Sequence, residues 1–120
     1  DEGMREYYLA VALQNTNDKK GAIAHYKTAV KLNPLNARVC IAATNYFNET
    51  GNLQDGYDLL QEAITYNPDN GDLLVAYCKQ AIQLNLAMYA EALLPEMEGI
   101  VAPAEINEIK QMIKKASTIE

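Results

Sequence analysis

Apolar residues recur along the chain at intervals of three and four, the spacing that places side chains on one face of an α-helix. Leu9 and Leu13 form one such stripe, and Ile23 and Val30 belong to a second stripe that follows the polar break at 15–18. Two amphipathic helices with a short polar connection form a helical hairpin, and the same arrangement recurs downstream. The pattern predicts helices near 3–15, 18–32, 37–49, 53–66, 71–83, 86–99 and 103–117.

Residues at the predicted boundaries support these helices. Asp18 and Asn36 can each cap a following helix, and Pro34 ends the helix before it because proline lacks an amide donor. Pro103 suits the first turn of the last helix. Pro95, inside the sixth predicted helix, is expected to kink or break it.

The sequence also matches itself at one dominant offset, which carries residue 33 onto residue 67. Residues 33–36 read NPLN and residues 67–70 read NPDN, and Ala29 falls on Ala63 in the same register. Each hairpin leaves an apolar face uncovered, so neighbouring hairpins must stack to bury it. The chain is therefore predicted to be an array of helical hairpins.

The repeated unit resembles the tetratricopeptide repeat (TPR) family, in which small residues lie where two helices cross and a proline closes the second helix. In the first helices, the family's large-then-small pair is matched by Leu9 with Ala10 and, less closely, by Ala43 with Thr44. The third unit is weaker, because Met97 stands at a small position and Pro103 comes one residue late. The small, aromatic, small and proline positions of the second helices are matched by Ala22, Tyr26, Ala29 and Pro34, then by Gly56, Leu60, Ala63 and Pro68.

This resemblance implies an all-α fold, a right-handed α-α superhelix of about three helical hairpins with a C-terminal capping helix. The whole chain, 1–120, would be a single domain with repeats at about 3–36, 37–70 and 71–102 and the capping helix at about 103–118. The start has neither an initiator methionine nor a solvating helix. We therefore expect the chain to be a fragment of a longer one.

The resemblance also implies a concave groove, lined by the first helix of each hairpin, that receives a peptide or a helix of a partner protein. Tyr7 and Tyr8 would offer flat apolar area with a polar tip, and Asn45 and Asn48 could pair with a peptide backbone. The alternative is that some of these side chains only pack between hairpins. Carried over residue by residue, the groove positions are Tyr7, Tyr8, Val11, Gln14, Arg38, Ile41, Asn45, Asn48, Asp72, Val75, Lys79 and Ile82.

A carboxylate clamp, which some family members use for the tails of chaperones, does not fit this sequence. Asp72 would repel a carboxylate, while Arg38 and Lys79 leave two cations in the predicted groove. A ligand with one acidic group among apolar residues remains compatible with it. The places that correspond to the clamp hold Tyr7, Val11, Ala42, Asp72 and Ala76.

Composition narrows the range of partners. Ten Lys and Arg against sixteen Asp and Glu leave a net charge of -6, which would repel a phosphate backbone. No apolar run approaches the roughly 20 residues that a membrane-spanning helix needs. We expect neither nucleic-acid binding nor membrane insertion, and the cellular location stays open with the cytoplasm as the first expectation.

No catalytic constellation is apparent. His25 is the only histidine and is expected at the surface or an interface, the glycines form no phosphate-binding loop, and Cys40 and Cys78 suit small buried positions. We expect no enzyme, metal or cofactor. The predicted function is a protein-binding scaffold. The alternatives are self-assembly, through an N-terminal hairpin with no capping helix, and an appendage of a larger multidomain protein, and the repeats alone do not decide among them.

Overall fold

The computed structural model describes residues 1–117, and the regular secondary structure of this part is α-helical apart from one isolated bridge between Glu98 and Val101. All seven helices lie within two residues of their predicted bounds. The predicted end of the capping helix, residue 118, lies outside the described residues. The helices are α1 (Glu2–Asn15), α2 (Lys19–Leu32), α3 (Ala37–Glu49), α4 (Leu53–Tyr66), α5 (Gly71–Gln83), α6 (Ala87–Met97) and α7 (Pro103–Ser117).

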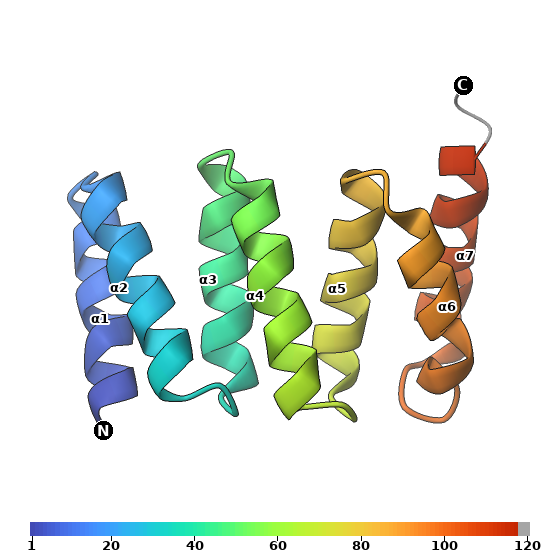
Figure 1. Cartoon of the computed structure of the whole chain (residues 1–120), viewed down its shortest axis with the longest axis horizontal. Coiled ribbons are helices and arrows are strands. Elements are labelled where there is room, and N and C mark those ends of the chain that lie inside the picture. Colours follow the sequence, from blue (N-terminus) through green and yellow to red (C-terminus); the bar gives the residue numbers. More distant parts are fainter. Residues whose placement is uncertain (118–120) are drawn as a thin grey trace.

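Consecutive helices pair as hairpins that stand side by side in a row (Figure 1). The hairpins α1–α2, α3–α4 and α5–α6 follow one another along the long axis, and α7 lies at the far end against α5 and α6. The molecule measures 40 × 31 × 19 Å. Each hairpin therefore contacts its neighbours in the row, as expected of a repeat array.

The first helix of every hairpin ends in the same way. Asn17, Gly51 and Asn85 follow these helices at positive φ values of 63, 81 and 63°, a left-handed conformation that glycine and asparagine tolerate best. Their numbers differ by the offset found in the sequence, 17 to 51 and 51 to 85. The internal repeat is therefore present in the backbone as well as in the residue types.

Polar caps begin the second and third helices, as predicted. Asp18 Oδ1 accepts a hydrogen bond from the Gly21 amide at 3.0 Å, and Asn36 Oδ1 accepts one from the Val39 amide at 3.2 Å. Pro95 was expected to kink or break its helix. The helix α6 continues past this proline and ends at Met97. The helix leaves the helical conformation at the next residue, so the proline lies in its last turn.

Small residues lie buried where the helices of a hairpin cross. Ala29 and Ala63 are 1% and 0% exposed, in keeping with the register read from the sequence. Cys40 and Cys78 are likewise fully buried free thiols. Burial raises the pKa of each thiol to about 11, so both stay protonated and unreactive at neutral pH.

Aromatic side chains connect one hairpin to the next. The ring of Tyr26 on α2 lies 5.4 Å from that of Tyr46 and meets Phe47 edge to face, both on α3. Between α4 and α5 the rings of Tyr57 and Tyr77 stack at 5.3 Å, and their hydroxyls are 2.9 Å apart in a hydrogen bond. These contacts fix the spacing of adjacent hairpins.

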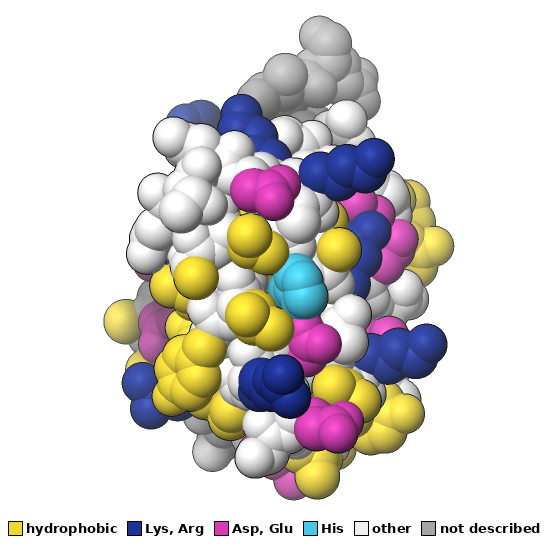
Figure 2. Space-filling view, turned by 90° about the vertical axis from the view of Figure 1, so that its left-hand side faces the viewer, with side chains coloured by type: hydrophobic (Ala, Val, Ile, Leu, Met, Phe, Trp, Pro, Cys, Tyr) yellow, Lys and Arg dark blue, Asp and Glu magenta, His cyan; other side chains and the backbone are white. Residues whose placement is uncertain are grey.

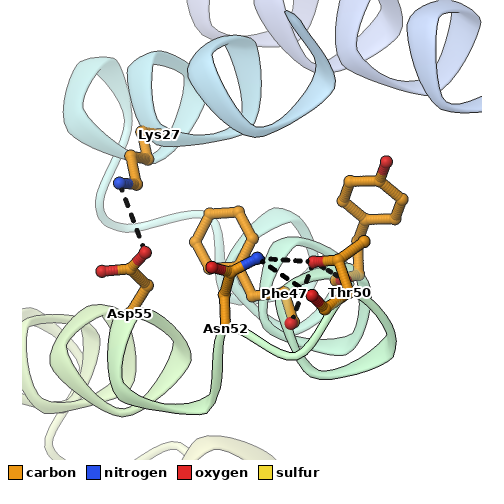
Figure 3. A network of polar contacts seen from close by, with 6 residues as sticks. Lys27, Phe47, Thr50, Asn52 and Asp55 are labelled. Carbon is orange, nitrogen blue, oxygen red and sulfur yellow. Dashed lines mark hydrogen bonds and ion pairs between the residues drawn. The ribbon is translucent and has the colours of Figure 1, made fainter. Parts of the chain in front are cut away.

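Hydrogen bonds hold the turn between α3 and α4, and a separate ion pair nearby joins α4 to α2 (Figure 3). The Thr50 hydroxyl donates to the carbonyl of Phe47, and the Asn52 side-chain amide donates to Thr50 Oγ1 at 2.8 Å. Close by, Lys27 on α2 pairs with Asp55 on α4 at 3.5 Å. The hydrogen bonds fix the turn within its own hairpin, and the ion pair is a contact between two largely exposed side chains of adjacent hairpins.

Candidate protein-interaction groove

A pocket of about 520 Å³ lies between α1 and α3. It brings together five of the twelve predicted groove residues, namely Tyr7, Tyr8, Arg38, Ile41 and Asn45. We call this pocket the α1–α3 groove. Its remaining lining residues are Met4, Asn36, Val39 and Ala42.

The two tyrosines of the groove differ in how much of each side chain is exposed. Tyr7 is half-buried and its ring packs 6.1 Å from that of Tyr26, so it is part of the wall. Tyr8 is 64% exposed and contacts Tyr7 with ring centroids 5.6 Å apart. Tyr8 therefore offers a large amphipathic surface that the fold leaves uncovered.

The α3 side of the groove supplies hydrogen-bonding groups. Arg38 and Asn45 are exposed, and their side chains make no hydrogen bond or ion pair with any other described residue. Asn36 is held in place, because its Oδ1 caps α3 and its amide contacts Met4 Sδ at 3.5 Å. The groove thus combines a fixed wall with a cation and an amide that remain available.

The other seven predicted residues do not line this pocket. Gln14 accepts a hydrogen bond from the Tyr26 hydroxyl at 2.6 Å, and Lys79 pairs with Glu108 of α7 at 3.3 Å. Asn48 exchanges two hydrogen bonds with Gln80. Of the rest, Val75 is buried in the core, Val11 and Ile82 are half-buried against it, and Asp72 is exposed.

The sequence reasoning missed two lining residues that the repeat could have identified. Met4 stands at the position that the offset carries onto Arg38, and Ala42 corresponds in the same way to Tyr8. Applying the offset to every groove position would have found both residues. Asn36 was recognised only as a cap.

Other candidate chemistry can be located on the structure. His25 Nδ1 lies in contact with Glu6 Oε2, which joins α2 to α1 through an ion pair when the imidazole is protonated. Across residues 1–117, no group of three or more His, Cys, Asp or Glu side chains could hold a metal ion. None of the described helices is long and apolar enough to span a membrane.

Comparison with known proteins gives one informative similarity. No protein-family model matches the chain. A stretch of 68 residues, 57% of the chain, is 31% identical to a Caenorhabditis elegans protein described as BBSome complex member bbs-4. The matched part of the chain spans only 15% of the length of that protein. The chain is thus an all-α protein with a local similarity to a member of a multiprotein complex.

Proposed function

We propose that this chain is a TPR-type array of three repeats in a right-handed superhelix, with α7 as its C-terminal cap. The recurring positive φ at Asn17, Gly51 and Asn85 supports this assignment. Within α7, Ile106 and Ile109 are buried while the opposite face carries exposed lysines, as a capping helix requires.

We propose further that the array is a protein-interaction scaffold that binds a segment of a partner protein in the α1–α3 groove. The observation that carries this proposal is the pocket itself. It presents an exposed aromatic ring, an exposed guanidinium and an exposed amide, from Tyr8, Arg38 and Asn45, above a wall held by internal contacts. Tyrosine and arginine are the residue types most often found at the energetic centre of protein interfaces.

The similarity to a member of the BBSome complex supports a role inside a larger assembly. In this proposal the chain contributes binding surface and has no catalytic activity of its own. Any activity of the assembly would then come from other domains or subunits. Affinity enrichment from a lysate would identify the partner that occupies the groove.

The proposal is tested by affinity enrichment from a lysate of the source, with wild-type chain and a Tyr8→Ala/Asn45→Ala variant immobilised in parallel. Both positions are exposed, so the variant should fold normally. A Tyr66→Ala/Asn15→Ala variant changes the same residue types outside the groove and serves as the matched control. We expect a set of proteins retained by wild type and control and lost from the groove variant. Equal retention by all three would contradict groove binding.

Self-assembly is a second candidate, and the outer face of the first hairpin favours it (Figure 2). In this hairpin Leu9 of α1 is 41% exposed, and Ala12 of α1 and Ala24 of α2 are exposed as well. Hydrophobic side chains gather around the histidine on this face (Figure 2). A concentration-dependent mass in sedimentation that Leu9→Ser reverses would support this candidate, whereas a monomer at all concentrations would reject it.

A further inference from the structure

A second pocket adjoins the α1–α3 groove and extends it around α1. It measures about 480 Å³ and is lined by Asp1, Met4, Arg5, Tyr8 and Leu9. Met4 and Tyr8 line both pockets, so the two adjoin one another at these side chains. The joined surface is called the extended groove below. Its centre is apolar, with the thioether of Met4 and the ring of Tyr8.

Both arginines of the protein lie on this surface. Arg5 lines the second pocket and Arg38 lines the first, on opposite sides of Met4 and Tyr8, and every other basic side chain except the histidine is a lysine. A guanidinium presents a planar fork of donors that matches a carboxylate and also stacks on aromatic rings. Two such groups therefore flank one apolar centre.

Neither arginine has its charge matched by an acid among residues 1–117. Both side chains are exposed and form no ion pair with another described residue, whereas Lys27 and Lys79 are paired with Asp55 and Glu108. Several exposed lysines of the described residues also lack an ion pair, so the arginines are distinguished by their place on either side of one apolar centre. An acidic partner would supply the missing charge.

The acid that lines the extended groove is already engaged. Asp1 is the only acid in its lining, and Asp1 Oδ1 accepts hydrogen bonds from the amides of Gly3 and Met4 at 2.7 and 3.3 Å. This capping contact places the negative charge of Asp1 at the positive end of α1. Glu6, one residue beyond Arg5, is paired with His25. The two guanidinium groups therefore remain available to a ligand.

We propose that the extended groove binds an extended acidic segment of a partner protein. An apolar side chain of that segment would lie against Met4 and Tyr8, and acidic side chains on either side of it would pair with Arg5 and Arg38. This inference rests on the proposed function and adds the chemistry of the partner to it. It also moves the centre of recognition to α1, away from Lys79, which is occupied by Glu108.

The test selects peptides from a phage-displayed random library on the immobilised chain and measures the best synthetic peptide, fluorescently labelled, by anisotropy. We expect selected peptides to carry acidic residues on both sides of an apolar one. Arg5→Gln and Arg38→Gln should each weaken binding about fivefold, the effect of one largely exposed ion pair. Lys110→Gln on α7 removes the same charge far from the groove and should leave binding unchanged.

A charge-reversal pair distinguishes direct contact from general electrostatics. Arg5→Glu/Arg38→Glu should weaken binding of the acidic peptide well beyond either glutamine variant and gain binding to a version of that peptide with lysines in place of its acids. All substituted side chains are exposed, so unfolding curves should coincide and any loss of binding can be assigned to the groove.

Several results would overturn the inference. These are a library that yields no enriched peptide, enriched peptides without acidic residues, or arginine variants that bind as tightly as wild type. The proposed function is tested separately. If the lysate partners are lost from the Tyr8→Ala/Asn45→Ala variant but retained by both arginine variants, groove binding stands and the acidic-segment inference fails.

Discussion

Gly56 of α4 lies beside a buried pair of amides, and replacing it with alanine should destabilise the protein. Gln80 of α5 is 3% exposed, donates to Asn48 Oδ1 at 2.7 Å and to the Leu53 carbonyl at 2.8 Å, and accepts from Asn48 Nδ2 at 2.9 Å. A Cβ at position 56 would lie 2.9 Å from Gln80 Nε2 and 3.1 Å from Asn48 Oδ1. The amide pair must move to admit it.

Two opposing terms set the size of the effect. Alanine is favoured over glycine inside a helix by about 1 kcal/mol. Each hydrogen bond lost from the amide pair costs about 1 kcal/mol net, and displacing Gln80 Nε2 weakens both of its bonds, a loss of about 2 kcal/mol. We therefore expect Gly56→Ala to lower the free energy of unfolding by about 1 kcal/mol.

Urea unfolding followed by far-ultraviolet circular dichroism measures this difference. The same substitution, made in a variant that lacks the two amides, tests its cause. In the Asn48→Ala/Gln80→Ala variant the amides are absent, and the nearest remaining neighbour of the new Cβ is Thr44 Cγ2 at 3.3 Å. There Gly56→Ala should stabilise the protein by up to about 1 kcal/mol, through helix propensity. A stabilising effect in the wild-type background, or the same effect in both backgrounds, would refute this reasoning.

Three further predictions concern the core. Ala29→Leu should cost about 1 to 3 kcal/mol, because Ala29 is 1% exposed and the crossing has no room for the added carbons; an unchanged melting temperature would contradict the assigned helix crossing. Tyr57→Phe removes the hydroxyl bonded to Tyr77 at 2.9 Å and should lower the free energy of unfolding by about 1 kcal/mol, measured in urea; no change would show that water replaces the bond. The buried thiols of Cys40 and Cys78, each with a pKa raised to about 11, should resist a thiol reagent at neutral pH until denaturant is added. Since the folded state holds these protons more tightly than the unfolded state, stability should fall as the pH rises from about 8.5 towards 11; a flat profile in that range would contradict the burial argument.

The sequence alone predicted the helices and their order because the signals for them are local. Asp18 and Asn36 each cap a helix through the amide three residues away, and the apolar stripes need only the helical period. The small residue at 29 was likewise identifiable, since the repeat aligns it with Ala63 and both are buried. Pro95 was harder to interpret, because its effect depends on its distance from the end of its helix.

Which groove residues are available was decided by the tertiary structure. Arg38 and Lys79 were both predicted as cations of the groove, yet Lys79 meets Glu108 of α7 while Arg38 meets no described acid. Asn48 is engaged by Gln80 in the same way. These pairings join side chains about 30 positions apart, so they depend on how the hairpins and α7 pack together. The adjacency of the two pockets at α1 has the same origin, because it follows from the placement of Met4 and Tyr8 against α3.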